Sequence, residues 1–293
     1  MSKHILVTGS KGQVGSELQV LSTLDGSQHF TFYFTDKETL DIANKSEVET
    51  FCKVNNIDTI INCAAYTAVD KAEEDKEMAN LINHVAVQYL AEIAKSYTIQ
   101  LIHISTDYVF DGQNHRPYIE NDSVNPQGIY GKTKLDGEKV MIKINPANSL
   151  IIRTSWVYSS FGNNFVKTML RLGKERDELG VIFDQVGTPT YAKDLAHTIL
   201  TILQSHDMME NNMVPIYHYS NEGVCSWYDF VKEIFTLSNI ECNVKPILTE
   251  QYPTPAKRPH YSLLNKTKIK AAYKLDIPYW KNSLSSCLNY IST

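Results

Sequence analysis

Short β-branched runs alternate with longer segments of helical periodicity through the first half of the chain, and this alternation limits the folds open to it. The β-branched runs predict strands at Ile5–Thr8, Phe30–Thr35, Thr59–Cys63, Leu101–Ile104 and Leu150–Arg153. The segments between them predict helices at Val14–Leu24, Ser46–Asn55, Met78–Ser96 and Tyr130–Ile142. Strands that alternate with helices pair in parallel, and nearly continuous apolar strands are buried on both faces. We therefore expect an α/β fold with a doubly wound parallel sheet.

The second half of the chain lacks this regular alternation. Helical spacing returns at Asn164–Arg176, Ala192–Ser205 and Trp227–Leu237, Ile216–Tyr219 predicts a strand, and the prolines of Tyr252–Pro259 predict an extended loop. We expect one domain from residues 1–155 with roughly 186–215. A smaller C-terminal α/β portion, from roughly 156–185 with 216–293, would complete the molecule.

Charge and cysteine content exclude several classes of function. With 28 Lys and Arg against 33 Asp and Glu, the formal net charge is −5, which is not the balance of a nucleic-acid-binding protein. The five cysteines form no Cys-x-x-Cys pair, which indicates free thiols rather than a disulfide framework or a zinc site. The residues before the first strand lack the longer apolar stretch of a signal peptide, so we expect none, and no apolar run approaches the ~20 residues that span a bilayer. We expect a soluble, cytoplasmic protein that binds neither nucleic acid nor membrane.

A glycine-rich turn joins the first strand to the first helix. Gly9, Gly12 and Gly15 have the spacing Gly-x-x-Gly-x-x-Gly, which is neither the Gly-x-Gly-x-x-Gly fingerprint nor a Walker loop. The turn still brings a helix N-terminus close to where a pyrophosphate can bind, so it predicts a dinucleotide site of the Rossmann type. A turn without any ligand is the alternative. Asp36, 21 residues after Gly15, is placed to bind an adenosine ribose, or is an ordinary turn residue.

Tyr130 and Lys134 open the helix that follows the fourth strand. Residues four apart share a helix face, and a cation beside a phenol lowers the pKa of that phenol. A phenol tuned in this way can exchange a proton with a carbonyl or an alcohol. Ser105 and Thr106 end the preceding strand, where open α/β sheets bind ligands, so one of them could donate to a substrate carbonyl. The simpler alternatives are a solvated helix face and a threonine that closes a turn.

Together these motifs resemble the dTDP-4-dehydrorhamnose reductase family, a branch of the extended short-chain dehydrogenases/reductases. The resemblance runs almost from end to end. Its motifs are Gly12–Gly15 with Glu17-Leu18, Leu40-Asp41-Ile42, Asn62–Glu73, Ser105–Gly112, Tyr130–Leu135, Arg153–Tyr158, Gly162–Phe165, Asp184-Gln185 with Gly187 and Pro189-Thr190, and Arg258-Pro259 with Ser262 and Leu264. The threonine-bearing strand end and the Arg-Thr-Ser-Trp segment are specific within the superfamily.

The resemblance implies a role for individual residues. Tyr130 would donate the proton, Lys134 would lower its pKa and hold the nicotinamide ribose, and Thr106 would polarise a C4 ketone. The cofactor, NADPH or NADH, would be bound by Gly9, Gly12, Gln13, Val14, Gly15, Asp36, Asp41, Ile42, Ala65, Tyr66, Thr67, Tyr130 and Lys134. The substrate would be bound by Thr106, Asp107, Tyr108, Trp156 and Arg258.

The implied reaction is the NAD(P)H-dependent reduction of the C4 ketone of dTDP-4-keto-6-deoxy-L-mannose, also named dTDP-4-dehydro-6-deoxy-L-mannose. The product is dTDP-L-rhamnose, a precursor of surface polysaccharide, and the step is the last one of its biosynthesis. One alternative is another nucleotide-sugar 4-ketoreductase, epimerase or dehydratase. Tyr108 stands where related dehydratases carry a carboxylic acid, which argues against elimination. The other alternative is a non-catalytic subunit that resembles the regulatory subunit of methionine adenosyltransferase.

The resemblance leaves cofactor preference and assembly open. Asp36 repels the 2′-phosphate of NADP, whereas the adjacent Lys37 could receive it, so we expect both cofactors to serve. Some members of the family form a homodimer around a magnesium ion that three glutamates hold. Here Glu17 matches one of them, Lys193 stands at the second position, and Ser283–Thr293 has no carboxylate side chain. We expect no metal site, and any homodimer not to be metal-bridged.

Overall fold

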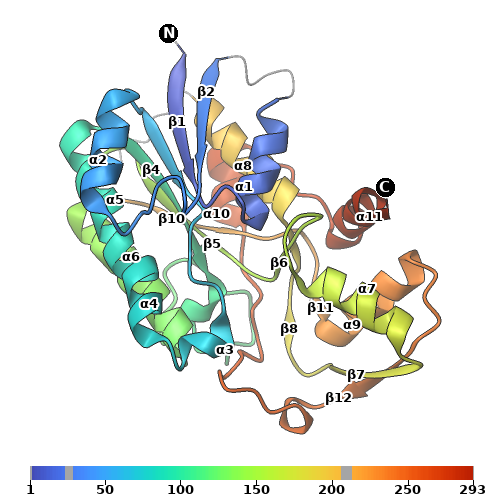
Figure 1. Ribbon diagram of the computed structural model, residues 1–293. Coiled ribbons are helices and arrows are strands. Elements are labelled where there is room, and N and C mark those ends of the chain that lie inside the picture. The colour runs from blue at the N-terminus through green and yellow to red at the C-terminus, as the bar shows by residue number, and fades with distance from the viewer. Residues whose placement is uncertain (1, 24–28, 206–212, 293) are drawn as a thin grey trace.

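The computed structural model describes residues 2–23, 29–205 and 213–292, which form two lobes (Figure 1). The larger lobe is built on a six-stranded sheet in the order β10-β5-β4-β3-β1-β2. All neighbouring strands in it pair in parallel. They are β1 (Lys3–Thr8), β2 (Phe30–Thr35), β3 (Thr59–Asn62), β4 (Gln100–Thr106), β5 (Leu150–Thr154) and β10 (Ile216–Tyr219). The doubly wound parallel sheet expected from the sequence is confirmed.

Helices cover both faces of this sheet because successive strand residues point to opposite sides. Ile5 and Val7 belong to one buried core and Leu6 to the other. The first core packs against α1 (Gln13–Leu21), α8 (Ala192–Gln204) and α10 (Thr267–Tyr273) (Figure 1). The second packs against α2 (Lys45–Val54), α5 (Ala86–Tyr97) and α6 (Ile129–Ile144). Of the expected helix Val14–Leu24, Leu24 lies outside the described residues.

The smaller lobe has its own aromatic and aliphatic core. Its helices are α7 (Phe165–Glu175), α9 (Trp227–Leu237) and α11 (Trp280–Ser292). Three strand pairs complete it: β7 (Glu178–Ile182) with β12 (Asn243–Ile247), β8 (Val186–Gly187) with β11 (Cys225–Ser226), and β6 (Val157–Tyr158) with β9 (Thr190–Tyr191). The sequence did not predict α10, α11 or the β7–β12 pair.

The expected helix over Met78–Ser96 is three segments in the structure. α4 (Lys76–Asn80) is followed by a π-helical turn, η1 (Leu81–Val85), and then by α5. Short helical turns also occur at α3 (Val69–Ala72), η2 (Asp107–Val109) and η3 (Thr249–Gln251). A π-turn inside an α-helix is frequent at functional sites, and this one lies beside α6.

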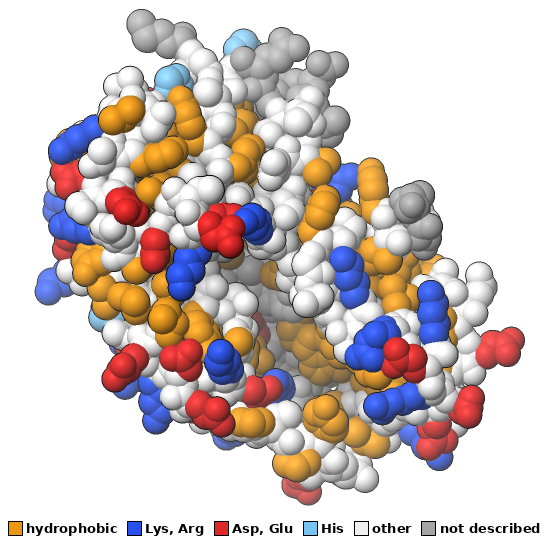
Figure 2. Space-filling view, viewed as in Figure 1, with side chains coloured by type: hydrophobic (Ala, Val, Ile, Leu, Met, Phe, Trp, Pro, Cys, Tyr) orange, Lys and Arg blue, Asp and Glu red, His pale blue; other side chains and the backbone are white. Residues whose placement is uncertain are grey.

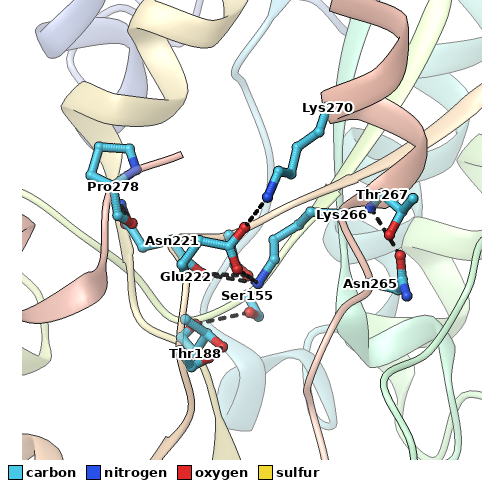
Figure 3. A network of polar contacts seen from close by, with 11 residues as sticks. Ser155, Thr188, Asn221, Glu222, Asn265, Lys266, Thr267, Lys270 and Pro278 are labelled. Atoms are coloured by element: carbon cyan, nitrogen blue, oxygen red, sulfur yellow. Dashed lines mark hydrogen bonds and ion pairs between the residues drawn. The ribbon is translucent and has the colours of Figure 1, made fainter. Parts of the chain in front are cut away.

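The two lobes meet where the chain leaves the large sheet (Figure 3). The hydroxyl of Ser155, just after β5, donates to the carbonyl of Thr188 at 3.1 Å. Asn221, just after β10, accepts from the N–H of Tyr191 at 2.7 Å. The buried Lys266 donates to the carbonyl of Asn221 at 3.1 Å, which ties the approach to α10 to the same junction. These buried contacts hold the lobes in one arrangement.

One strand of the large sheet, β10, falls in the part of the chain that the expected domain division gives to the smaller portion. Ile216–Tyr219 pairs with β5 in the large sheet, although residues 216–293 were assigned to the smaller portion. Val186-Gly187, assigned to the dinucleotide domain, pairs with Cys225-Ser226 instead. We therefore propose the same two-part division with these two segments exchanged and with α10, which packs on the first core of the large lobe, moved to the dinucleotide-binding domain. In the described ranges, no helix is long and apolar enough to cross a membrane.

Candidate active site

A cavity of about 990 Å³ lies between the two lobes, at the carboxyl ends of β1, β3, β4 and β5. Figure 2 shows the molecule hollowed there, with hydrophobic side chains inside the hollow. In open α/β sheets, ligands bind at this edge, beside the point where the strand order reverses. The order reverses between β1 and β3 here, so this cavity is the candidate active site.

The structure brings most of the predicted site residues to this cavity. Its lining includes Gly12, Gln13, Val14, Ala65, Thr67, Thr106, Asp107, Tyr108, Tyr130, Lys134, Trp156 and Arg258. The predicted residues outside the lining are Gly9, Gly15, Asp36, Asp41, Ile42 and Tyr66. Asp41 lines a separate cavity of about 710 Å³, and Ile42 is buried.

The glycine turn is shaped by close backbone contacts. Gly9 has a φ of +67°, and a β-carbon there would lie 2.7 Å from the backbone of Ala64. A β-carbon on Gly15 would lie 2.5 Å from the carbonyl oxygen of Gly9. α1 begins with no side-chain cap at Gly12 and no acidic residue in its first turn. Its first N–H groups therefore remain available to a phosphate group.

The carboxylate of Asp36 accepts hydrogen bonds from its own turn and forms an ion pair with a lysine of the glycine loop. Its Oδ1 accepts from the N–H groups of Glu38 at 2.9 Å and Thr39 at 3.1 Å. Lys11 forms ion pairs with both Asp36 and Glu38. The Lys11 ammonium holds the pKa of Asp36 below its usual range. Lys37 is exposed and lines the separate cavity, so the cation beside Asp36 is Lys11.

Thr106 and Asp107 form a buried pair at the end of β4. The Thr106 hydroxyl donates to Oδ1 of Asp107 at 3.1 Å and accepts from the N–H of Tyr108 at 3.2 Å. Burial raises the pKa of Asp107 to about 6, against the lowering effect of nearby hydroxyls. The ring of Tyr108 meets that of Tyr130 edge to face, with 5.4 Å between centroids. The strand end thus places a hydroxyl and a carboxyl beside Tyr130.

Tyr130 lies at the start of α6, and its pKa is not lowered in the structure. Burial raises the pKa of its phenol to about 12, and the hydrogen bond with Thr106 acts in the opposite direction. The expectation that Lys134 brings this pKa toward neutrality is therefore wrong for the structure described, because desolvation outweighs other influences. Glu73 fixes the start of the helix by accepting from the N–H of Ile129 at 2.8 Å.

Lys134 is almost fully buried on α6, with 2% of its surface exposed. Its Nζ donates to the carbonyl of Ile104 at 2.6 Å, and Nε2 of His103 lies 3.4 Å away. Burial lowers the pKa of Lys134 to about 8, although the charge of Glu138 raises it. An amine with such a pKa can give up a proton near neutral pH.

Asn83 is a buried residue that supports the site from outside the cavity, and sequence reasoning missed it. It lies in the π-turn η1, accepts from the N–H of Tyr66 at 2.9 Å and donates to the carbonyl of Tyr66 at 3.1 Å. Its amide also donates to the hydroxyl of Thr133 on α6 at 3.2 Å. Asn83 thereby fixes the loop of Ala65, Tyr66 and Thr67 against the helix of Tyr130. No sequence pattern reports a π-turn, so only the structure could reveal it.

Trp156 lies on the lobe side of the cavity in a backbone conformation that few residues adopt. Its φ is +50°, which is uncommon for a residue with a side chain. The ring stacks on that of Trp227, with 3.5 Å between centroids and 10° between planes. Phe165 packs on Trp227 at 4.5 Å. Phe165 ends a motif of the family resemblance but was not predicted as a site residue, and Trp227 was not predicted because its helix is distant in sequence.

Arg258 is paired rather than free. Its guanidinium donates to both carboxylate oxygens of Asp70, at 2.9 and 2.7 Å. This bidentate pair joins the loop of Tyr252–Pro259, confirmed as an extended loop, to α3 of the large lobe. Arg176 and the exposed Tyr252 also line the cavity and were not predicted.

Glu17 does not belong to a cluster of metal ligands. It is buried and accepts from the hydroxyl of Ser159 at 2.6 Å, and burial raises its pKa. The charge of Lys193 acts on Glu17 as well. Within the described residues, no group of three or more His, Cys, Asp or Glu could hold a metal ion.

Known proteins resemble this chain over its whole length. The family model described as the RmlD substrate binding domain matches residues 3–293. A dTDP-4-dehydrorhamnose reductase of Escherichia coli (strain K12) is 42% identical, over 99% of this chain and 98% of its own length.

Two solved structures are similar in both sequence and fold. The dTDP-4-dehydrorhamnose reductase of Clostridium acetobutylicum is 43% identical, with a TM-score of 0.92 over 99% of this chain and 100% of its own. The dTDP-4-dehydrorhamnose reductase of Bacillus anthracis, solved in complex with NADP, is 38% identical, with a TM-score of 0.91 over 100% of both chains.

Proposed function

We infer the function of this chain from its family: it belongs to the dTDP-4-dehydrorhamnose reductases. It is an NAD(P)-dependent oxidoreductase of dTDP-L-rhamnose biosynthesis. We propose that it reduces the C4 ketone of dTDP-4-dehydro-6-deoxy-L-mannose in the cavity between the lobes. The main support for assigning this activity to particular residues is that Thr106, Tyr130 and Lys134 line the same cavity as the glycine turn.

The residues at the glycine turn fit a dinucleotide cofactor. Gly9 and Gly15 leave no room for a side chain, and the uncapped start of α1 offers N–H groups to a pyrophosphate. Oε1 of Gln13 is buried without a hydrogen-bond partner in the described structure, although its Nε2 donates to Val157 at 3.3 Å. Such an orphaned acceptor fits a site whose ligand supplies the missing donor. When bound, NADPH or NADH supplies the hydride.

Tyr130 is the proton donor in this proposal. A phenol whose pKa burial raises to about 12 stays protonated throughout the neutral range, as donation to a forming alkoxide requires. Thr106 donates to the same substrate oxygen after its hydroxyl turns away from Asp107. Two donors at the ketone oxygen stabilise the charge that develops there.

Lys134 holds the nicotinamide ribose and returns a proton to Tyr130. Both residues lie on one face of α6, and both line the cavity. The lowered pKa of Lys134, about 8, suits an amine that is mostly charged at neutral pH but can release a proton. The rate of reduction should therefore fall as the pH rises through this value.

The lobe side of the cavity binds the nucleotide sugar in this proposal. Trp156, stacked on Trp227, offers a flat apolar surface to the deoxysugar. Arg258 and Arg176 supply guanidinium groups for the diphosphate, which suits bidentate donors. Arg258 would exchange at least part of its pairing with Asp70 for the substrate.

Lys11 is the residue that we assign to cofactor choice. Asp36 disfavours a 2′-phosphate, but the Lys11 ammonium lies against that carboxylate and offers a compensating charge. We therefore propose that both NADPH and NADH serve. We also propose a cytoplasmic location, because the five cysteines are free in the structure, and that any homodimer forms without a bridging metal.

The experiment that tests the function is cofactor oxidation by the purified protein. We expect NADPH and NADH to be oxidised with dTDP-4-dehydro-6-deoxy-L-mannose, and dTDP-L-rhamnose to form in equal amount. UDP-glucose and UDP-galactose serve as controls for epimerase activity. Interconversion of these two sugars would favour an epimerase, and no turnover with any sugar would favour a non-catalytic subunit.

A further inference from the structure

A buried histidine that the proposed mechanism does not use lies directly behind Lys134. His103 is on β4 and has no exposed surface, and its Nε2 is 3.4 Å from Nζ of Lys134. Burial and the charge of Lys134 hold the pKa of His103 well below its usual range, so its ring is neutral. A neutral imidazole has one N–H and one acceptor nitrogen. Nε2 of His103 therefore presents either an N–H or a lone pair to Lys134, depending on which ring nitrogen carries the proton.

The hydrogen bonds of Asn62 decide this question. The N–H of Ala64 can only donate, and it donates to Oδ1 of Asn62 at 3.2 Å. The hydroxyl of Thr8 donates to the same oxygen at 2.7 Å. The NH₂ group of Asn62 therefore points to Nδ1 of His103, 3.0 Å away, and donates to it. With Nδ1 as acceptor, the ring proton is on Nε2 and faces Lys134.

The other groups around Lys134 do not replace this contact. Nζ donates to the carbonyl of Ile104 at 2.6 Å. The carboxylate of Glu138, one turn along α6, is held by Arg153 at 2.6 and 2.9 Å. The charge of Glu138 therefore raises the pKa of Lys134, but its carboxylate is already paired with the guanidinium of Arg153.

Two further titratable groups face Lys134, and both are neutral. Cys63 follows β3 and acts on Lys134 by its charge only when ionised, while Tyr130 lies on the same face of α6. Burial raises the pKa of each to about 12. Of the neutral groups, His103 is the one that turns a fixed N–H toward the amine.

We propose that His103 is a positioning residue that favours proton release from Lys134. Its Nε2–H repels an ammonium but can donate to a neutral amine, because only the amine has a lone pair. In the reaction, Tyr130 gives its O–H proton to the substrate oxygen and becomes a phenolate. Lys134 then gives a proton to the phenolate, remains as the amine that accepts from Nε2–H, and regains a proton from water in the cavity.

The test compares two substitutions of similar shape. In His103→Gln the amide can accept from Asn62 and still present an N–H to Lys134, whereas His103→Met has no donor. The measurement is the pH profile of kcat/KM for NADPH-dependent reduction of dTDP-4-dehydro-6-deoxy-L-mannose. We expect wild type and His103→Gln to lose activity near pH 8. His103→Met should lose it about 0.5–1 pH unit higher, the scale of one hydrogen bond.

Profiles that coincide in all three proteins, with similar Tm values, would overturn the proposal. A second measurement needs no substitution: ¹⁵N spectra of histidine-labelled wild-type protein report the tautomer of His103. We expect Nε2–H between about pH 6 and 9, and an Nδ1–H or charged ring would contradict the proposal.

The inference rests on the proposed function, and the two can fail separately. An active enzyme with an Nδ1–H ring refutes only the role of His103. A protein that shows the Nε2–H ring but does not reduce the keto sugar refutes the proposed function.

Discussion

The cavity has a sheet wall, formed at the strand ends of the large lobe, and a lobe wall, formed by the smaller lobe, and the two are built in different ways. Behind the sheet wall, polar side chains are buried and bonded across neighbouring elements, as Asn62 is to His103 and Glu138 is to Arg153. On the lobe wall, stacked rings such as Trp156 and Trp227 are only half-buried. The sheet wall is fixed before any ligand arrives, whereas the lobe wall offers surface that a ligand can cover.

This difference predicts which kinetic constant, kcat or KM, responds to substitutions on each wall. Preorganised donors lower the barrier of the chemical step, so changes on the sheet wall should lower kcat. Apolar surface and guanidinium groups that bind the substrate stabilise the bound state throughout the reaction, so changes on the lobe wall should raise KM.

The largest effect is expected on the sheet wall. Tyr130→Phe removes only a hydroxyl and should lower kcat by roughly 10²–10⁴-fold, the scale of lost general acid catalysis, with little change in cofactor affinity. Tyr97→Phe, the same change in an exposed tyrosine of α5, is the matched control and should keep the wild-type rate. Steady-state kinetics measure both, and wild-type turnover in Tyr130→Phe would remove the phenol from the mechanism.

On the lobe wall, Trp227→Ala should act mainly on KM. Loss of the ring under Trp156 removes stacking and apolar burial that together contribute about 1.5–3 kcal/mol, so KM for the nucleotide sugar should rise roughly 10–150-fold while kcat changes little. Trp227→Phe keeps a ring and should show a smaller rise. A fall in kcat at unchanged KM would place Trp227 with the chemistry and erase the distinction between the walls.

The Asp70–Arg258 pair spans both lobes, and a smaller effect is expected there. Arg258→Lys keeps the charge but loses the bidentate geometry, so KM should rise about 5–20-fold with kcat nearly unchanged. Asp70→Asn is the comparison, because it removes the competing carboxylate and should not raise KM. An equal rise in both variants would show that the pair matters only as a structural contact.

Cofactor choice is set at the far end of the sheet wall, where we expect changes of about 3–10-fold. Asp36→Ala should shift the ratio of kcat/KM values toward NADPH by removing a charge that repels the 2′-phosphate. Lys11→Met should shift the same ratio toward NADH, because the compensating ammonium is lost. Ratios that stay constant in both variants would place this ion pair outside the ribose pocket.

The smallest effect is expected from chelation. Glu17 is bonded to Ser159, feels the charge of Lys193 as well as that of Asp194, and belongs to no group of three ligands within the described residues, so removal of divalent metal should change neither the rate nor the oligomeric state. Activity and sedimentation of chelated enzyme, with and without added magnesium, measure this. A large and reversible loss of either would reveal a metal site that involves Glu17.

The sheet wall could be predicted from the sequence because its residues lie beside strand ends. Thr106 is the last residue of β4, and the glycine turn follows β1, so periodicity and spacing placed both at one edge. The reactive groups themselves were predicted, but the pKa shift of Tyr130 was predicted in the wrong direction. Spacing shows that Lys134 shares the helix face of Tyr130. The extent of burial, which decides whether the pKa of the phenol rises or falls, depends on the folded structure.

The lobe wall could be predicted only in part. The resemblance to the family supplied Trp156 and Arg258, whereas Trp227 and Arg176 also line the cavity and no local pattern marks them. Asn83 acts through a π-turn, and Lys11 through an ion pair across the glycine loop. Such contacts depend on tertiary packing, which single-sequence patterns do not encode.

The carbon that receives the hydride tests reduction of the C4 ketone most directly. Reduced cofactor labelled with deuterium at both C4 positions of nicotinamide should transfer one deuterium to C4 of the sugar, giving dTDP-L-rhamnose labelled at that carbon. NMR spectra of the product reveal the position of the label. Label at C4, formed far more slowly by Tyr130→Phe than by wild type, is the predicted result. Label at another carbon, or oxidised cofactor without a labelled sugar, would contradict reduction of the C4 ketone in this cavity.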